Sequence, residues 1–196
     1  MSKTLVFATN NPHKLEEIRA IAGPDFRIMS LADVDCHDDI PETGATLEEN
    51  ALQKARWVKE RYGYDCFADD TGLEVEALAG APGVHSARFA PGTDHDSAAN
   101  MRHLLALMED CTDRRARFRT VIALIAGGAE HLFEGKVEGE ILDAPAGEGG
   151  FGYDPLFRPE GWNCTFAQAT AAQKNAVSHR GRATAALIDY LLKSEI

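Results

Sequence analysis

The sequence predicts an α/β fold in which helices flank a long mixed sheet. Segments with strand periodicity alternate with segments of helical periodicity, and a Gly127-Gly128 pair joins two strand segments as a hairpin turn would. The hairpin makes the sheet mixed rather than purely parallel. A chain of 196 residues can bury its core as one domain over residues 1–196, and long β-arms would give that domain two lobes with the active-site cleft between them.

The chain begins with a predicted strand, helix and strand. Residues 3–8 form a short β-rich run, and a helix follows with Asn11 as its N-cap and Pro12 at its first position. Gly23-Pro24 ends the helical pattern, and residues 26–31 read as a second strand. This order is typical of a βαβ unit.

An acidic irregular stretch, residues 33–42, separates this unit from a second helix. Thr46-Leu-Glu-Glu49 has the spacing of a capping box, and a helical apolar face continues from it to a stop at Gly63. The sequence therefore predicts a helix over most of residues 47–62.

Two acidic residues follow the next strand. Residues 66–68 read as a brief apolar strand ending in Asp69-Asp70, and Thr71-Gly72 reads as a turn into the alternating residues 73–77. We expect a loop over 80–92.

The second half is predicted as helix, hairpin and helix. Residues 101–108 have helical apolar spacing, and Arg115–Ala126 alternates before becoming apolar, as a strand entering a core does. The return strand covers 131–137, and we interpret the arginines as a solvated face opposite Glu134 and Glu138.

Composition excludes several classes of function. The net charge of −11 disfavours binding to a nucleic-acid backbone, although a few cations can still attract a small anion at short range. No apolar run is long enough to span a membrane, so we expect no membrane association. The start shows no signal-peptide organisation and the four cysteines are scattered, so we expect a cytoplasmic protein with free thiols.

Cations stand at the N-terminal ends of two predicted helices. Lys14 lies in the first turn after Asn11, and His179 and Arg180 lie in the first turn after Ser178, where each such placement costs about 0.3–1 kcal/mol. Either placement alone fits an exposed residue that tolerates the helix dipole. Together they indicate one anionic ligand such as a polyphosphate. The candidate ligand-binding residues at these two places are Thr9, Asn10, Asn11, Lys14, Lys174, His179 and Arg180.

The Asp69-Asp70 pair predicts a magnesium site. Adjacent carboxylates repel each other, and at the end of a buried strand a cation or hydrogen-bond donors must compensate them. Mg²⁺ prefers oxygen ligands and is typically held by one or two carboxylates plus substrate phosphates. Glu42 is the natural second ligand, whereas Asp38 and Asp39 fit a solvated acidic loop.

A glycine-rich segment, Gly147–Gly152, would let backbone approach a ligand closely. Phe151 or Tyr153 could cover a flat base, but an aromatic residue after a flexible loop is more often part of the core. The segment alone leaves both readings open.

Six segments of the chain, in order, resemble the inosine triphosphate pyrophosphatases, also called XTP/dITP diphosphatases. These segments are FATNNPHK at 7–14, ETG and ENALQKA within 42–55, ADDTGLEVEAL at 68–78, GAPGVHSAR at 80–88, GGFGYDPLF at 149–157 and KNAVSHRGRA at 174–183. The resemblance covers nearly the whole chain. It departs only where Thr71 replaces a commoner serine and where Ala172-Gln173 replaces residues that are often acidic.

The resemblance implies a role for each matching residue. It implies that Glu42 and Asp70 hold Mg²⁺ and that Asp70, together with Asp69, is catalytic, with Asp70 as the proton acceptor. The residues that it implies in substrate binding are Thr9, Asn10, Asn11, Lys14, Thr71, Phe151, Gly152, Tyr153, Asp154, Lys174, His179 and Arg180. The implied fold is a two-lobed α/β structure around a long, strongly twisted mixed sheet, usually in a homodimer.

The activity implied is hydrolysis of ITP, dITP, XTP or dXTP to the monophosphate and pyrophosphate. Mg²⁺ would neutralise phosphate charge, and Asp70 would orient or deprotonate the attacking water. Two alternatives remain open: a nucleotide sensor without turnover, and a triphosphatase that releases orthophosphate. On this reading, Lys14→Ala slightly stabilises the empty protein and weakens substrate binding.

Overall fold

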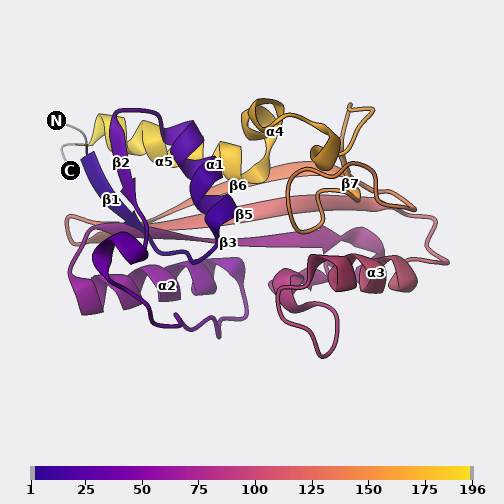
Figure 1. Ribbon diagram of the computed structural model, residues 1–196, viewed down its shortest axis with the longest axis horizontal. Coiled ribbons are helices and arrows are strands. Elements are labelled where there is room, and N and C mark those ends of the chain that lie inside the picture. The colour runs from indigo at the N-terminus through magenta and orange to yellow at the C-terminus, as the bar shows by residue number, and fades with distance from the viewer. Residues whose placement is uncertain (1–2, 195–196) are drawn as a thin grey trace. The chain divides into compact units, whose positions relative to one another are not determined.

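The computed structural model describes residues 3–194 and contains a mixed sheet flanked by helices (Figure 1). The strands are β1 (Lys3–Phe7), β2 (Phe26–Met29), β3 (Cys66–Val75), β4 (Pro82–Gly83), β5 (Arg115–Ala126), β6 (Ala129–Ile141) and β7 (Phe157–Pro159). The α-helices are α1 (Pro12–Ala22), α2 (Leu47–Tyr62), α3 (Ser97–Leu107), α4 (Ala171–Val177) and α5 (His179–Lys193).

The sheet has the strand order β2-β1-β3-β5-β6-β7, with β4 paired to β3. Strand β1 runs parallel to β2 and β3, whereas β4 is antiparallel to β3 and β7 to β6. The prediction of a mixed α/β sheet is therefore confirmed. The chain forms two compact units, in agreement with the predicted two lobes. The first contains the residues up to Asp70, Thr120–Gly135 and those from His179 onward, and the second contains Thr71–Arg119 and Lys136–Ser178.

In the first unit, α1 and α5 lie side by side on one face of the strands (Figure 1). Ile18 of α1 and Leu187 of α5 are each 1% exposed and pack in one cluster with Phe7 and Phe67, whose rings stack at 4.6 Å. Full burial of side chains of this size contributes roughly 1.5–3 kcal/mol each. This cluster holds α1 and α5 against the strands of the first unit.

The start of α1 agrees with its prediction. The Asn11 side chain accepts hydrogen bonds from the backbone N–H groups of His13 and Lys14, at 3.0 and 3.2 Å, and Pro12 occupies the first helical position. Because Pro12 has no N–H, these bonds satisfy two of the three N–H groups at this end that have no partner within the helix. The helix ends at Gly23, which has φ +70°.

Helix α2 covers the opposite face of the first unit's strands (Figure 1). The Cys66 thiol of β3 contacts the Ala55 carbonyl of α2 at 3.2 Å, which places the two elements against each other. Thr46 caps the helix by accepting from Glu49 N–H, as predicted. The Glu49 carboxylate, however, accepts from the N–H of Ala45 rather than that of Thr46, so the predicted reciprocal box is displaced by one residue.

The predicted turn at Thr71-Gly72 is wrong, because β3 runs unbroken from Cys66 to Val75. The glycine serves another purpose: a Cβ on Gly72 would lie 2.6 Å from the carbonyl oxygen of Gly83 on β4. Gly72 therefore permits the close approach of a neighbouring strand rather than a change of direction. As a result, Asp69 and Asp70 lie inside a strand and not at its end.

The second unit has its own core around Leu73, Leu104, Phe118 and Phe157. Strands β5 and β6 follow the predicted hairpin, with Gly127 and Gly128 between them at φ +56° and +80°.

The arginine face of β5 has acidic neighbours on both adjacent strands. Arg117 donates to Glu74 of β3 at 2.6 Å, and Arg119 lies 3.5 Å from the same carboxylate. Glu138 of β6, one of the two predicted partners, also adds to the raised pKa of Arg117. Alternation along β5 identifies a polar face but does not identify which neighbouring strand supplies the opposite charge.

The C-terminal segment contains two helices where the sequence analysis predicted one. Thr170 caps α4 and forms a full capping box with Gln173, the residue that stands in place of an acidic one. Ser178 then adopts an extended conformation, and α5 begins at His179 as predicted. Within residues 3–194, no helix is long and apolar enough to cross a bilayer.

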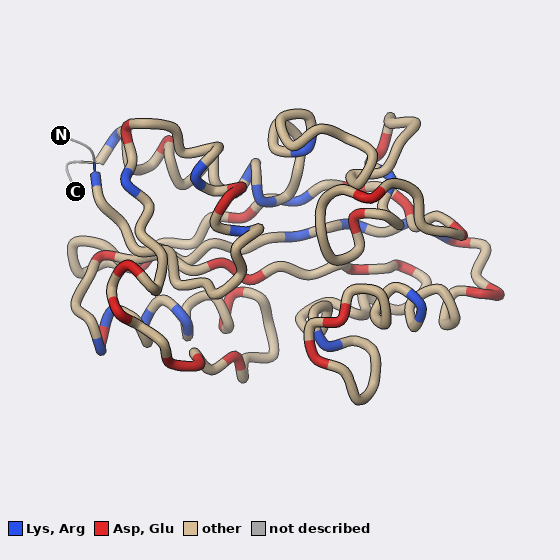
Figure 2. The backbone as a smooth tube through the Cα atoms, viewed as in Figure 1, with Lys and Arg blue, Asp and Glu red and all other residues tan. Residues whose placement is uncertain are grey.

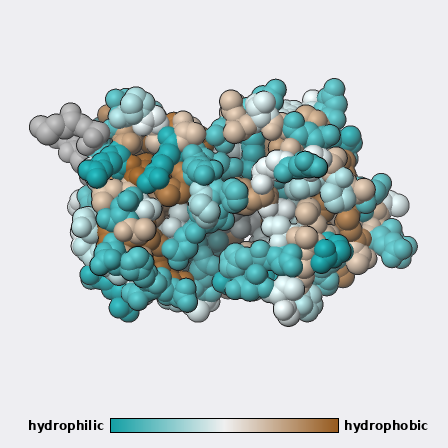
Figure 3. Space-filling model, viewed as in Figure 1, coloured by the Kyte–Doolittle hydropathy of each residue, from teal (hydrophilic) through white to brown (hydrophobic). Residues whose placement is uncertain are grey.

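The surface agrees with the acidic composition. Figure 2 shows acidic residues distributed along most of the chain among the basic ones, consistent with the net charge of −11. On the face drawn in Figure 3, hydrophilic residues predominate and hydrophobic ones are seen mainly between them.

Candidate active site

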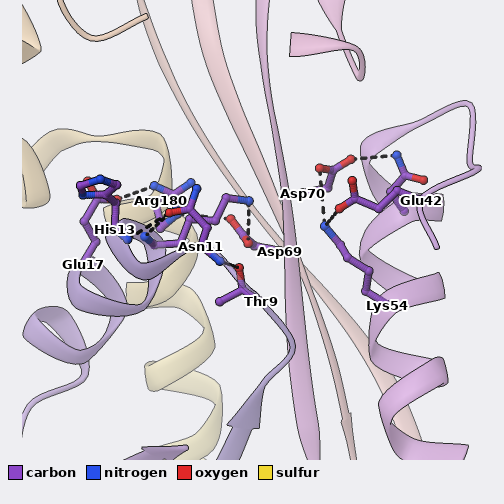
Figure 4. Close-up of polar contacts among 11 residues, drawn as sticks. Thr9, Asn11, His13, Glu17, Glu42, Lys54, Asp69, Asp70 and Arg180 are labelled. Carbon is purple, nitrogen blue, oxygen red and sulfur yellow. Dashed lines mark hydrogen bonds and ion pairs between the residues drawn. The ribbon is translucent and has the colours of Figure 1, made fainter. Parts of the chain in front are cut away.

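Two neighbouring carboxylates of β3 point to opposite sides of the strand (Figure 4). Side chains alternate along a strand, so Asp69 shares the side of Phe67, toward α1 and α5, and Asp70 shares the side of Cys66, toward α2. The exposed fractions of Asp69 and Asp70 are 1% and 8%. The sequence analysis considered Mg²⁺ or hydrogen-bond donors as the compensation for this pair, and for Asp69 the structure shows two cationic side chains of the protein itself.

Asp69 lies between the two cations that sequence analysis assigned to a ligand. Lys14 Nζ of α1 donates to its Oδ1 at 2.9 Å, and Arg180 Nε of α5 donates to its Oδ2 at 3.2 Å. Arg180 is 1% exposed and also donates to Glu17 of α1. The two cationic helix starts therefore meet at a carboxylate of β3, and the anionic ligand that the sequence analysis predicted for them stays a prediction.

The packing of α5 on β6 places Arg180 within this group. A Cβ on Gly135 of β6 would lie 2.0 Å from the His179 carbonyl oxygen and 2.5 Å from Ala183 N. A glycine is therefore required where the helix backbone touches the strand. His179 itself is 3% exposed.

The charges of this group keep Asp69 ionised. Burial by itself would raise the pKa of Asp69, but Lys14 and Arg180 outweigh burial and hold that pKa well below its usual value. Burial lowers the pKa of Lys14, although Asp69 opposes the shift. The pKa of Arg180 stays raised, since Asp69 and Glu17 offset its burial. Asp69 is a fixed anion that organises two cations.

The loop after β1 lies directly beside this group. Ala8 N donates to Phe67 O at 2.8 Å, which ties the end of β1 to β3 just before Asp69. Thr9 Oγ1 accepts from Asn11 N at 3.1 Å, and Asn10 is exposed. The predicted phosphate-binding residues Thr9, Asn10, Asn11 and Lys14 thus form one short turn at the carboxyl end of β1, where ligands of open α/β sheets bind.

Asp70 has a different set of neighbours, supplied by α2 and the loop before it. Asn50 Nδ2 donates to Asp70 Oδ2 at 3.0 Å, and Lys54 Nζ lies 3.7 Å from Asp70 Oδ1 while also contacting Glu42 (Figure 4). Asn50 in turn accepts from Gly44 N at 2.7 Å. The sequence prediction that Glu42 and Asp70 lie at one site is met by this geometry.

Gly44 fixes the loop that carries Glu42. A Cβ there would lie 2.6 Å from Glu49 Cβ and 2.9 Å from Asn50 Oδ1. The loop can therefore pack against the first turn of α2 only with a glycine at this position.

One lysine is shared by two carboxylates on the Asp70 side. Asp70 and Glu42 both contact Lys54, whereas Asp69 contacts both Lys14 and Arg180. Burial raises the pKa of Asp70 and Glu42 adds to that shift, while Lys54 and Lys14 oppose it. Burial lowers the pKa of Lys54 on its own, but Asp70 and Glu42 leave it raised.

Two carboxylates that share one lysine can hold a divalent cation with oxygen ligands. Over residues 3–194, no group of three or more His, Cys, Asp or Glu side chains could form a metal site by itself.

The second unit holds another buried ion pair among the predicted binding residues. Lys174 Nζ of α4 donates to Asp154 Oδ2 at 2.7 Å and lies 4.7 Å from the centre of the Phe151 ring. Asp154 Oδ2 also accepts from Phe151 N at 2.9 Å. Lys174 and Asp154 are 4% and 2% exposed, so together they fix the segment that carries Phe151.

Tyr153 belongs to the core of the second unit. Its ring is 4% exposed and its hydroxyl donates to the Ser86 carbonyl at 2.8 Å. Of the two aromatic residues considered for covering a base, Phe151 is partly exposed and Tyr153 is buried. Gly152, at φ +63°, and Thr71 of β3 are both partly exposed.

Sequence reasoning missed Asn50 and Lys54. They lie four residues apart on α2 and so occupy one side of the helix, next to the buried Ala51 and Ala55. A polar pair at that spacing beside an apolar face was the available signal. Lys54 is 7% exposed, and a lysine buried to this extent is rare unless it is paired.

Comparison with known proteins places this arrangement in a family. The model of the Ham1 family matches residues 5–190. A dITP/XTP pyrophosphatase of Porphyromonas gingivalis is 56% identical over 96% of this chain and 97% of its own. One of Flavobacterium psychrophilum is 52% identical over 95% and 97%.

Solved structures are similar over the same extent. A Ham1 protein of Coxiella burnetii superimposes with a TM-score of 0.89 at 36% identity, covering 98% of this chain and all of that one. The Ham1 protein of Staphylococcus aureus gives 0.87 at 39% identity, over 97% and 98%. With a family model that spans nearly all of the sequence and relatives that match it from end to end, this chain belongs to the Ham1 family.

Proposed function

We propose that this chain hydrolyses the non-standard purine nucleoside triphosphates ITP, dITP, XTP and dXTP to the monophosphate and pyrophosphate. The names of its relatives support this substrate class, since curated proteins that are 51–56% identical over nearly the whole chain are called dITP/XTP pyrophosphatases. The observation that carries the proposal is the pair Asp70 and Glu42 beside Lys54. A phosphate-binding protein without a hydrolytic role gains only repulsion from carboxylates at that place.

We propose Mg²⁺ as the cofactor, held by Glu42 and Asp70. The donor set supports it, because both ligands are carboxylate oxygens and they share the charge of one lysine. When bound, Mg²⁺ would neutralise charge on the phosphate oxygens and align them for attack by water.

The two aspartates have different roles in this proposal. Asp70 orients the attacking water at the α-phosphate and accepts its proton, because it lies on the side where two carboxylates share one lysine. Asp69 is engaged by Lys14 and Arg180 and acts as a positioning residue that holds Lys14. This division separates two aspartates that the sequence analysis grouped together as catalytic.

The remaining predicted residues divide between the two ends of the substrate. We propose that the turn Thr9–Lys14 and Thr71 bind the phosphates, since backbone N–H groups and a lysine converge at a helix start. For the purine we propose Phe151 as a ring that stacks on it, with backbone groups of Gly152 and Tyr153 beside it. Lys174 and Asp154 fix that segment.

His179 and Arg180 are the proposed donors to the keto oxygen at position six. An exocyclic amine cannot accept those hydrogen bonds, so the two donors would favour ITP and XTP over ATP.

A product assay tests the reaction. The purified protein is incubated with Mg²⁺ and ITP, XTP, ATP or GTP, and pyrophosphate and orthophosphate are measured separately. We expect pyrophosphate from ITP and XTP. Binding without product would identify a sensor, and orthophosphate would identify a triphosphatase that cuts the outer phosphates; either result contradicts the proposal.

The variant Asp70→Asn tests the carboxylate within the same assay. Removing a proton acceptor and metal ligand should lower kcat by at least about 10²–10⁴-fold. Asp189→Asn, which removes an exposed carboxylate of α5, is the matched control and should retain the wild-type rate. A near-normal rate for Asp70→Asn would remove Asp70 from its proposed role.

We also propose that the protein acts as a homodimer in the cytoplasm, as the family resemblance implies. Light scattering on the eluted protein measures the first property. A monomeric mass at micromolar concentration would contradict it.

A further inference from the structure

Lys54 lies between the two carboxylates to which we assign the metal. It projects from α2 toward the strand, contacts Glu42 Oε1 and lies 3.7 Å from Asp70 Oδ1 (Figure 4). Its side chain is 8% exposed, so water screens these charges poorly. The ammonium group of Lys54 thus compensates charge on both carboxylates, those of Glu42 and Asp70.

The carboxylates are held in place independently of Lys54. Asn50 donates to Asp70 Oδ2, the oxygen that Lys54 does not face, at 3.0 Å, and Gly44 N anchors Asn50 at 2.7 Å. Glu42 stands two residues before Gly44, on the same anchored loop. Removing the lysine would therefore leave Asn50 and Gly44 holding the loop and Asp70 together.

The same oxygens cannot serve both cations at once. An ammonium group and a carboxylate oxygen lie about 2.7–2.9 Å apart, and Mg²⁺ lies about 2.0–2.1 Å from its oxygen ligands. A cation held by Glu42 and Asp70 would therefore compete with Lys54 Nζ for these oxygens, and the two cations would repel each other there.

We propose that Lys54 is an internal substitute for the metal: it occupies the place between Glu42 and Asp70 in the empty protein and leaves when a divalent cation binds. The inference rests on the metal ligands assigned under the proposed function. Without a cation, two carboxylates so close together would repel each other, so the lysine keeps the empty site intact and weakens metal binding. Once displaced, its ammonium is available to phosphate oxygens of the substrate.

Metal affinity without nucleotide tests the exchange. The dissociation constant of Mn²⁺ is measured by electron paramagnetic resonance for the wild type, Lys54→Gln and Lys54→Arg at one pH and ionic strength. We expect Lys54→Gln to bind Mn²⁺ about tenfold more tightly, because the competing charge is gone, and Lys54→Arg to bind close to the wild type. A lysine that only orients the carboxylates predicts the opposite sign, so weaker or unchanged binding by Lys54→Gln overturns the proposal.

Lys59→Gln is the matched control. It removes the same charge from the same helix, but Lys59 pairs with Asp65 at 2.9 Å and makes no contact with Glu42 or Asp70. Its Mn²⁺ affinity should equal that of the wild type. An equal gain in Lys54→Gln and Lys59→Gln would reveal a general charge effect and overturn the proposal.

A measurement on the wild type avoids any dependence on how the variants fold. Amines are modified with acetic anhydride with and without Mn²⁺, and the modified peptides are quantified by mass spectrometry. We expect Mn²⁺ to increase modification of Lys54 relative to Lys59. Unchanged or reduced modification of Lys54 would contradict its release.

The outcomes separate this inference from the proposed function. If Lys54→Gln binds Mn²⁺ more tightly but the wild type releases no pyrophosphate, the displacement of Lys54 by the metal is supported and the proposed reaction is contradicted. If the wild type releases pyrophosphate but Lys54→Gln binds Mn²⁺ with unchanged affinity, only the displacement of Lys54 is contradicted.

Discussion

Each side of β3 carries a buried carboxylate, and the two carboxylates have different charged neighbours. Asp69 has the cations Lys14 and Arg180 at hydrogen-bond distance, and its charge is compensated within the protein. Asp70 shares Lys54 with Glu42. The first side is built for stability and position, and the second is built to receive a cation. Removing the carboxylate should therefore lower the free energy of unfolding on the Asp69 side, and leave it unchanged or raise it on the Asp70 side.

The largest expected effect is on the compensated side. Asp69→Asn leaves Lys14 and Arg180 without their shared anion, and breaking a buried pair in this way costs about 3–5 kcal/mol of unfolding free energy. Urea unfolding in the presence of a chelator measures it. The exposed carboxylate variant Asp189→Asn should show little change, and an Asp69→Asn protein as stable as the wild type would erase the contrast between the two sides.

A smaller loss is expected from Lys14→Met, which keeps most of the side chain but removes its charge. Arg180 still compensates Asp69, so we expect a loss of about 1–3 kcal/mol, the usual cost of one missing partner of a buried group. Sequence reasoning gave the opposite sign, a slight gain from removing a cation at a helix start.

The same unfolding experiment decides between these signs. Lys193→Met, which breaks an exposed pair with Asp189, is the control and should change stability little. A stabilised Lys14→Met protein would return Lys14 to the role of a ligand-binding cation only.

The smallest change is expected for Asp70→Asn. Burial raises the pKa of Asp70, so ionising this carboxyl costs more free energy in the folded protein than in the unfolded chain. Without metal, Asp70→Asn should be as stable as the wild type or more stable, by up to about 1 kcal/mol. Any such gain should be present at pH 7 and disappear as pH falls toward the ordinary aspartate pKa, about 3.9.

Asp69 should behave in the opposite way with pH. Its pKa is lowered in the folded protein, so its stabilising effect is complete above the ordinary aspartate pKa and is lost only as pH falls below it. Comparing Asp69→Asn and Asp70→Asn with the wild type between pH 7 and pH 3 measures both trends. Parallel trends in the two variants would contradict the difference between the sides.

Local signals predicted much of the fold. The cap at Asn11, the helix stop at Gly63 and the hairpin at Gly127-Gly128 are set by residues within a few positions of one another, and the structure agrees at each. Gly72 shows where such signals fail. A glycine that permits a turn and a glycine that permits a neighbouring strand to approach look alike in a sequence, and only Gly83 distinguishes them here.

In the candidate site, local sequence signals identified the charged residues but not all of their partners. Sequence analysis found Glu42 and Asp70, and it grouped Lys14 with Arg180, two side chains that the structure shows on either side of Asp69. It could not identify Asp69 as their shared partner, because the turn predicted after Asp70 hid the alternation of β3. Lys54 was missed because its partners are more than ten residues away in the chain.

The continuity of β3 also restricts how the sequence can change. Each residue added to or removed from a strand exchanges the two faces for every residue that follows. Deleting Ala68 would bring Asp70 to the side of Lys14 and Arg180, turn Thr71 toward α2 and leave Asp69 on the α2 side two positions before the present place of Asp70, so neither acid would keep its present partners. The segment therefore tolerates substitution far better than a change in length, and its register is itself part of the site.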